Sequence, residues 1–543
     1  MDMMFFLVRF VFHYKNPKFM KNIILLFGTL FLFSCQSTKK FNQQLTQPIA
    51  VTQLQKDVEY SYKKLKQLHP KLYWYISKEK LEYKFDSLKK SIKQPMTGLA
   101  FYKELSQVVK HVGQGHLSVS PSLPKTTKKE AKALNKKGKS PFSQFDFEYI
   151  DNKLIITKNR SRHSILVNTE VVSINSEKPS DLISLFSKRI ASDGYNTTLI
   201  NRYLGKYFGA FFNIDKGKVQ DSLHLLLKLE GKDSLFVVKR DTFGSNSNQK
   251  MPKLSKKERK EKAKFNSKYG FNSDTKTFTR ELKFLDKDSI TAMISIKQFS
   301  NGNYHDFYED AFNILSVANT KNLIIDLRNN GGGRLNEIAD LYSYLTLEPF
   351  VFIDDYEVVS KTSFLHMNYF KGSGYVTKFF KILGAPIFYP LFYFKTRKEA
   401  SGTYLSNRHS KQRKPKPNNF KGKIYVLING GSFSASSIIS SNLKSTQRAF
   451  FVGEETGGAY NGTVAAQMPL VQLPNSKVNL RIGLALVSAA GKTNIEGRGV
   501  FPDKEILPTL EDRNNNIDPE LNWILEDIRR EKEVERLIKP KNK

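Results

Sequence analysis

The sequence predicts a mixed α/β protein of several domains, and three patterns support this fold class. An apolar run at 424–428 leads into a turn of glycines and serines and then into helical spacing at 438–444. A strand–helix–strand pattern spans 290–328 and ends in consecutive glycines, whereas helical spacing dominates 53–109. Repeated β–α–β order indicates a parallel sheet covered by helices, and the helical segment in front of it indicates a further domain.

Composition limits the functional classes. The chain has 543 residues, which is enough for about two to four domains. Its formal net charge is +36, from 87 Lys and Arg against 51 Asp and Glu. The basic residues are spread along the chain and no nucleic-acid motif accompanies them. We therefore attribute the charge to a generally lysine-rich composition and expect no nucleic-acid partner.

The chain begins with the features of a lipoprotein signal peptide at 1–35. Lys21 precedes a short apolar core at 23–33, which is too short for a comfortable membrane span. The four residues ending at Cys35 resemble a bacterial lipobox, in which the cysteine is lipidated and becomes the mature N-terminus; a buried anchor helix with an incidental cysteine is the alternative. We expect a membrane-anchored lipoprotein of the bacterial cell envelope, facing the periplasm or the exterior, with a polar tether at 36–52.

The single cysteine, Cys35, also restricts the chemistry of the chain. It excludes disulfides within the chain and any cysteine-based metal site. We expect no metal and no organic cofactor.

Apolar residues recur every three or four positions across 53–68, and two further helical segments follow. This N-terminal helical domain, 53–120, runs into a Gly-Gln-Gly-His turn that ends at His116. Glycines on the near side of a histidine indicate a tight turn that presents the imidazole. His69, before a proline, and His111, at a helix end, are competing histidines with structural explanations.

Strand patterns with intervening turns fill 140–243. They resemble a PDZ domain, with 170–175 similar to that family's Gly-Asp-x-Ile-x-x-Ile-Asn region, although the leading Gly-Asp is missing. Residues 194–218 would then be an insertion in this PDZ-like module. The Ser-, Asn- and Lys-rich stretch 244–277 is interpreted as a basic linker, either solvated or a charged helix.

The second strand of the core pattern, 322–328, ends in Asn-Asn-Gly-Gly-Gly. Glycine-rich turns at the ends of strands bring backbone N–H groups close to a ligand. A phosphate loop is one interpretation, but no Gly-Lys-Ser/Thr follows. The amides of Gly331 and Gly332 are instead candidates for an oxyanion hole, together with the amide of Ala435 at the start of the later helix.

The later turn, 429–437, contains the candidate nucleophile Ser434. A small-residue turn between a strand and a helix lifts a hydroxyl clear of the sheet and aims the free N–H groups of the helix at what that hydroxyl attacks. A serine needs a base within hydrogen-bond reach and a third group that orients this base. The alternative is a helix N-cap supplied by Ser432, Ser434 or Ser436.

Together the two turns resemble the signatures of the tail-specific, or C-terminal-processing, serine peptidases. Residues 322–333 are similar to their Asp-x-Arg-x-Asn-x-Gly-Gly motif, and 431–437 to their Gly-Ser-Ala-Ser-Ala-Ser-Glu turn. The resemblance covers 53–120 and 280–510, with the PDZ-like module between them. It implies a ClpP/crotonase-like catalytic core of βαβ units that hydrolyses peptide bonds through an acyl-serine intermediate. It also implies a polypeptide substrate, with the PDZ-like module binding C-terminal tails.

The sequence departs from the Ser–Lys branch of this family. Ala459 stands where that branch has its basic lysine, and Lys444 is too early in the chain. A second branch, similar to the tricorn-protease core, uses a histidine turn and a glutamate in Glu-x-x-Gly-Val-x-Pro-Asp, and both are present. This resemblance implies Ser434 as nucleophile, His116 as general base and Glu496 as acidic partner.

Two positions leave this assignment open. Gly115 stands where the tricorn-like branch has a serine before the histidine, so the role of that serine is missing or is supplied elsewhere. Glu496 has a second explanation, as a surface acid that pairs with Arg498.

An aromatic and basic insertion is expected at 356–420, within the catalytic core of 280–510. Residues 361–398 contain no Asp or Glu, and the prolines among them argue against a membrane-spanning helix. The segment is interpreted as a cover over the active site or as an amphipathic patch on the membrane, with ordinary core packing as the alternative. The last segment, 511–543, is expected to be a helical tail.

The expected function is therefore that of a serine-type endopeptidase of the cell envelope. Two alternatives remain open. The first is a non-catalytic ligand- or peptide-binding lipoprotein on the same fold, because retinoid-binding relatives of this core exist and the lysine is absent. The second is a hydrolase of another acyl substrate, such as an ester. Failure of a serine-reactive probe to label Ser434 would favour the first alternative over a peptidase. A comparison of peptide and ester turnover would separate the second alternative from a peptidase.

Overall fold

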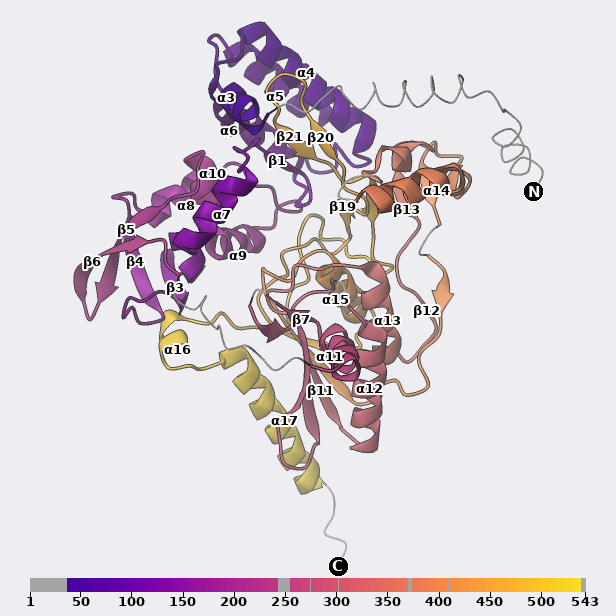
Figure 1. The fold of residues 1–543 in the computed structure, drawn as a ribbon. Coiled ribbons are helices and arrows are strands. Elements are labelled where there is room, and N and C mark those ends of the chain that lie inside the picture. The colour runs from indigo at the N-terminus through magenta and orange to yellow at the C-terminus, as the bar shows by residue number, and fades with distance from the viewer. Residues whose placement is uncertain are drawn as a thin grey trace, which may run out of the picture.

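The computed structural model describes residues 37–242, 254–273, 275–300, 302–369, 374–407 and 410–538 (Figure 1). The expected signal peptide at 1–35, including Cys35, lies outside the described residues, as does part of the basic linker. Where the sequence predicts a polar tether, the structure has helix α3, Thr38–Thr46. Ser37 caps this helix, because its hydroxyl accepts a hydrogen bond from the Lys40 amide at 3.2 Å.

Three helices follow where the apolar spacing predicts them: α4 (Val51–Leu68), α5 (Lys78–Ser91) and α6 (Gly98–Val109). Their buried faces, which include Leu54 and Phe101, belong to the same hydrophobic cluster as the central α/β core. This shared cluster fixes the end of α6, and with it the histidine turn, against the core.

The histidine turn lies between a 3-10 helix, η1 (Lys110–Val112), and strand β1 (Ser118–Ser120). Strand β1 pairs with β21 (Asn479–Arg481), which also pairs with β20 (Leu470–Gln472). The N-terminal histidine segment is therefore held by strands from the far end of the chain.

An antiparallel sheet with its own hydrophobic cluster follows, and Figure 1 shows it beside the core. Each strand pairs with its neighbours in sequence, in the order β2-β3-β4-β5-β6. The strands and the preceding helices are α7 (Lys128–Lys137), η2 (Pro141–Gln144), β2 (Phe145–Ile150), β3 (Lys153–Asn159), β4 (Thr169–Ile174), β5 (Ser222–Leu229) and β6 (Lys232–Lys239).

Three helices pack against this sheet: α8 (Pro179–Ser187), α9 (Thr198–Lys206) and α10 (Phe208–Asp215). The last two lie in the stretch that the sequence predicts to be an insertion. Phe208 and Phe212 are fully buried in the cluster of the sheet. The stretch is therefore part of the core of this module and not an addition to it.

The described part of the basic linker is a charged helix, α11 (Lys256–Tyr269). A capping box between Ser255 and Glu258 starts it, and Gly270 ends it in the left-handed conformation at φ 67°. A short hairpin of β7 (Phe271–Asn272) and β8 (Thr277–Phe278) leads on to the core.

The central sheet has the strand order β23-β18-β17-β11-β10-β9 and is parallel except for β9. Side chains alternate between its two faces, as the period of a strand requires. One face packs on the helices α12, α13 and α15, and the other on α17. The elements are β9 (Arg280–Phe284), β10 (Thr291–Ile296), α12 (Tyr304–Val317), β11 (Asn322–Asp326), α13 (Leu335–Leu345), β17 (Lys423–Ile428), α15 (Ala435–Ser445), β18 (Phe450–Gly453), β23 (Lys504–Glu505), α16 (Leu510–Asn514) and α17 (Pro519–Ile538).

The insertion and the end of the core build a second, antiparallel sheet in the order β14-β15-β13-β22-β19. The remaining elements are β12 (Phe350–Val351), β13 (Tyr356–Val358), η3 (Ser363–His366), α14 (Tyr375–Phe394), β14 (Thr396–Lys398), β15 (Tyr404–Ser406), β16 (Gln412–Arg413), β19 (Thr463–Ala465) and β22 (Ala485–Val487).

Helix α14 contains Pro386 and Pro390 in its interior. Its inner face packs Phe388 and Phe392 together at 4.8 Å between ring centroids. Several large apolar side chains point outward, Ile387 at 69% exposure among them. Within the described ranges no helix, α14 included, is both long enough and apolar enough to cross a membrane.

Candidate active site

The strands β11 and β17 lie next to each other and run parallel, so their carboxyl ends meet at one edge of the sheet. The turns that follow these strands carry the two sequence signatures. Asn429 joins them, because its side-chain oxygen accepts hydrogen bonds from the amides of Asn329 and Gly431, both at 2.9 Å. The Ser432 hydroxyl adds a hydrogen bond to the carbonyl of Leu327 at 2.8 Å.

The Asp-x-Arg part of the first signature stabilises this edge of the sheet. Arg328 forms ion pairs with Asp326 at 3.1 Å and with Asp518, just before α17, at 2.8 Å. These side chains connect β11 to the C-terminal segment.

Ser434 lies at the N-cap position of α15 in a strained backbone conformation, with φ 58° and ψ −117°. Its side chain makes no capping hydrogen bond to the helix. A non-glycine residue at positive φ persists only when its surroundings hold it, and such residues cluster at functional sites. The hydroxyl is therefore directed away from the helix and into the cleft that Ser434 lines.

His116 is presented to that hydroxyl by the predicted turn. Its Nε2 lies 3.0 Å from Ser434 Oγ, and its ring stacks on Phe433 with 4.6 Å between centroids. Gly115 leaves the necessary room, since a Cβ there would come within 2.8 Å of the Phe433 ring. The serine of the tricorn-like pattern would therefore clash at position 115.

Two residues that the sequence did not indicate complete the arrangement. Nδ1 of His116 lies 3.0 Å from Thr463 Oγ1, and this hydroxyl donates to Asp193 Oδ1 at 3.1 Å. Because the proton of Thr463 is directed to Asp193, Nδ1 must carry a proton and donate it. Nε2 is then the free lone pair that accepts from Ser434, which is the tautomer that a general base requires.

Burial sets the charge states of this relay. It lowers the pKa of His116 to about 3, and the nearby charge of Arg481 contributes to this shift. Burial raises the pKa of Asp193 to about 6, although hydrogen bonds from the amides of Gly115 and Ala459 and from the Thr463 hydroxyl oppose the rise. Near neutral pH the imidazole is therefore an uncharged base, and the carboxyl of Asp193 is ionised.

Glu496, the acidic partner implied by the sequence resemblance, lies elsewhere. Its side chain is exposed and accepts a hydrogen bond from Asn461 Nδ2 at 2.9 Å. It does not pair with Arg498 either, because that guanidinium binds Glu455. On the Nδ1 side of the imidazole, Thr463 and Asp193 occupy the position expected for the acidic partner.

The two positions considered for a basic lysine are also accounted for. Lys444 forms an ion pair with Asp503. Ala459 contributes its amide, which donates to Asp193 Oδ2 at 3.4 Å. Nothing at either position offers a second base for Ser434.

The glycine turn packs directly against Ser434. The amide of Gly332 donates to Asn330 Oδ1 at 2.9 Å, so it is not free to bind a ligand. Gly331 is exposed in the cleft, and Ala435 opens α15, where amides lack partners within the helix. Of the predicted oxyanion donors, Gly331 and Ala435 therefore remain suitable, whereas Gly332 acts by its small size.

Gly332→Ala is expected to lower kcat by about 10²-fold to 10³-fold, the loss typical of one oxyanion donor, because the added Cβ would displace the amide of Ala435. Gly332 has φ +95°, and a Cβ there would lie 2.8 Å from the Ala435 amide nitrogen and from Ser434 Cβ. Turnover assays on the folded variant measure the effect. At Gly331 a Cβ would meet nothing within 4 Å, so Gly331→Ala should lose clearly less. Equal losses in the two variants would contradict this account.

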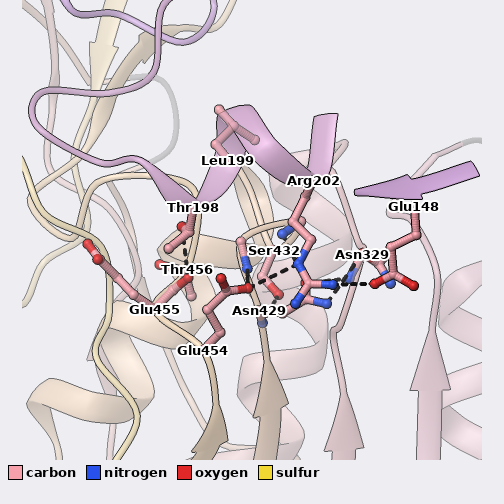
Figure 2. A network of polar contacts seen from close by, with 12 residues as sticks. Glu148, Thr198, Leu199, Arg202, Asn329, Asn429, Ser432, Glu454, Glu455 and Thr456 are labelled. Atoms are coloured by element: carbon pink, nitrogen blue, oxygen red, sulfur yellow. Dashed lines mark hydrogen bonds and ion pairs between the residues drawn. The ribbon is translucent and has the colours of Figure 1, made fainter. Parts of the chain in front are cut away.

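The cleft around Ser434 has a volume of about 630 Å³ and is lined by the histidine turn, the glycine turn and helices α9 and α10. Figure 2 shows how α9 is fixed to the core beside the nucleophile turn. Arg202 of α9 pairs with Glu148 of β2 and, at 3.1 Å, with Glu454. Glu454 also accepts from the amide of Gly430 at 3.0 Å. The antiparallel module thus forms one wall of the cleft.

Among the residues that the structure describes, no group of three or more His, Cys, Asp or Glu side chains is arranged to hold a metal ion. The chemistry available in the cleft is that of a serine activated by a neutral histidine, beside backbone amides that can bind an oxyanion.

Comparison with known proteins agrees with this class of site. Residues 290–506 match the sequence model of peptidase family S41. A carboxy-terminal-processing protease of Bartonella bacilliformis is 35% identical over 95 residues, which are 18% of this chain and 20% of that protein. The match thus spans about a fifth of the relative's length.

Solved structures show the same fold over most of the chain. Mature CPAF has a TM-score of 0.54 at 15% identity, over 85% of this chain and 94% of that chain. Mature CPAF in complex with lactacystin has a TM-score of 0.56 at 15% identity, over 86% and 95%. The mixed α/β, multidomain fold class predicted from the sequence is confirmed, whereas the PDZ-like character of the module is not. Over residues 290–506 the chain is therefore similar to peptidase family S41.

Proposed function

We propose that this protein is a serine peptidase that hydrolyses peptide bonds through an acyl-serine intermediate. The observation that carries the proposal is the hydrogen-bond relay from Ser434 through His116 and Thr463 to Asp193. The match of residues 290–506 to peptidase family S41 supports it. Such a relay supplies each element that a serine nucleophile needs: a base, a fixed tautomer and a buried negative charge.

In this mechanism Ser434 Oγ attacks the substrate carbonyl while Nε2 of His116 takes its proton. The imidazolium that forms is stabilised through Thr463 by the carboxylate of Asp193. The amides of Gly331 and Ala435 bind the oxyanion. Nε2 then gives its proton to the leaving amine, and the acyl-serine is hydrolysed by a water molecule that the same nitrogen activates.

Labelling by a fluorophosphonate, together with turnover of peptides and matched esters, tests this proposal. We expect label on Ser434 and cleavage at internal bonds of an unstructured polypeptide, read by mass spectrometry. An unlabelled Ser434 would favour a non-catalytic binding protein on this fold. Ester hydrolysis without peptide cleavage would favour a different acyl substrate.

Asp193→Asn is expected to lower kcat by about 10-fold to 100-fold, because the imidazolium loses the stabilising charge of one buried carboxylate. The pKa of Asp193 is raised to about 6, so activity of the natural enzyme should fall as the pH drops through that value and the carboxylate becomes protonated. The variant should lack this acidic limb, because asparagine does not titrate. A pH profile of kcat/KM measures both effects.

Two substitutions of Thr463, whose hydroxyl lies between His116 and Asp193, serve as controls for this prediction. Thr463→Val removes the link between His116 and Asp193, and should behave as Asp193→Asn does, whereas Thr463→Ser keeps the hydroxyl and should retain most activity. An acidic limb near pH 6 that persists in Asp193→Asn would contradict the role of Asp193 as a positioning residue.

We further propose that the protein is a membrane-anchored lipoprotein of the bacterial envelope, lipidated at Cys35. The lipobox-like sequence supports this, and so does α14, whose surroundings at 361–398 contain no acidic residue. Metabolic labelling with palmitate should mark the natural protein and not Cys35→Ala; equal labelling of both would refute the anchor. The exposed apolar side chains of α14 that would meet the membrane are Phe380, Ile382, Leu383, Ile387, Leu391 and Phe394.

The antiparallel module at 140–243 remains proposed as PDZ-like, with C-terminal tails of polypeptides as its ligands. Its contribution of one wall of the cleft supports a role in substrate binding. A peptide with a free C-terminus should then be cleaved more efficiently than its amidated form.

A further inference from the structure

Arg481 lies in β21 on the wall of the active-site cleft. In the β1–β21 pair it stands opposite Ser118, and Ser118 follows His116 by two positions. Its neighbours Leu480 and Ile482 are fully buried in the core. Because side chains alternate between the faces of a strand, the side chain of Arg481 is directed to the opposite face, towards the cleft that it lines. Burial is the main cause of the lowered pKa of His116, and the positive charge of Arg481 adds to it.

The other cations of the cleft have partners. Arg189 pairs with Asp215 at 2.7 Å, and Arg202 pairs with two glutamates. The ammonium of Lys206 lies over a tyrosine ring at 5.5 Å. Arg481, in contrast, has neither a hydrogen bond nor an ion pair to a carboxylate within the described parts of the chain, and burial lowers its pKa. Among the residues that the structure describes, no Asp or Glu lines the cleft.

A half-buried guanidinium has lost part of its hydration, and without an ion pair to a carboxylate this desolvation cost is not offset. A carboxylate from a bound ligand would restore this loss, since two parallel N–H···O bonds match its geometry. The apolar wall formed by residues such as Leu199, Phe211 and Met468 would strengthen that interaction.

We infer that Arg481 binds an acidic side chain of the polypeptide substrate and makes the cleft selective for acidic segments near the scissile bond. The inference rests on the proposed function in one respect, that the ligand of the cleft is a polypeptide. A free C-terminal carboxylate offers the same chemistry, so the experiment must separate the two sources.

Binding to Ser434→Ala protein tests this inference independently of turnover. The probes are fluorescent peptides that differ only by Glu or Gln at one position, scanned along an apolar sequence, with an amidated C-terminus throughout. Fluorescence anisotropy should show tighter binding of the Glu peptide by about 10-fold to 100-fold at one position. This preference should vanish in Ser434→Ala/Arg481→Gln. Equal affinities at every position, or a preference that survives the loss of Arg481, would overturn the inference.

Two further variants keep the result interpretable. Arg481→Lys retains the charge and should keep part of the preference. Arg529→Gln, at an exposed site of α17, makes the same change in net charge outside the cleft and should keep all of it. Loss of the preference in Arg529→Gln would reveal an unspecific charge effect and overturn the inference, as would a preference that appears only when the C-terminus is a free acid.

Turnover by the protein with Ser434 intact provides a second measurement. The ratio of kcat/KM for the Glu peptide to that for the Gln peptide should fall to about 1 in Arg481→Gln. If neither peptide is cleaved but the binding preference holds, the proposed hydrolysis is wrong and the acidic subsite stands.

Discussion

Ser434→Ala is expected to abolish peptide cleavage, with a fall in kcat of about 10⁴-fold or more. The hydroxyl is the atom that would form the acyl bond, and its one hydrogen bond in the described structure is with Nε2 of His116. Since the side chain does not cap α15, its removal should leave the thermal unfolding temperature nearly unchanged. Rates of peptide cleavage and calorimetry measure the two effects.

Ser436→Ala is the matched control, because it makes the same change two residues further along the same helix. Ser436 is fully buried, and its Oγ has no hydrogen-bond partner among the described residues. Its loss should therefore leave both cleavage and stability intact. Undiminished turnover in Ser434→Ala would show that another residue is the nucleophile.

His116→Gln is expected to lower kcat by about 10³-fold to 10⁴-fold and to slow fluorophosphonate labelling of Ser434 to a similar degree. Glutamine can still form hydrogen bonds to Ser434 and Thr463, but it cannot take up a proton. The effect on labelling matters most, because it reports on activation of the serine without a need for the natural substrate. Labelling rates and peptide cleavage are the measurements.

His111→Gln is the control for this prediction. His111 is an exposed histidine in η1, five residues before His116, and the sequence alone made it an alternative candidate to His116. Its replacement should leave labelling unchanged. Equal effects of the two substitutions would indicate that the histidine segment acts on folding rather than on proton transfer.

Most of the secondary structure at the site could be predicted because its signals are local. The apolar run that became β17 and the small-residue turn after it predict a strand and a helix start, and both are present. The glycines after β11 likewise predict a close approach, and Gly332 indeed lies against Ser434. At the level of sequence, the prolines at 361–398 argued only against a membrane-spanning helix, and helix α14 was not predicted. Prolines disfavour the interior of a helix, so α14 depends on contacts that only the tertiary structure supplies.

The orienting residues of the histidine could not be predicted. Asp193 lies in a Ser-Asp-Gly sequence that is typical of an ordinary turn, and Thr463 opens a short strand. Neither pattern distinguishes a catalytic partner from a structural residue. The family resemblance favoured Glu496, and the side chain of Glu496 instead binds Asn461.

The sequence by itself determined where a strand must end in a nucleophile turn, where a second strand must end in glycines and which histidine a tight turn presents. These features follow from residue type and spacing within a few positions, so they do not depend on the rest of the chain. Only the tertiary structure decided which groups orient that histidine, because the contacts of Thr463 join residues 347 and 270 positions apart. It also decided that Arg481 enters the cleft without a counter-charge, since burial and pairing of a side chain are properties of the packed fold.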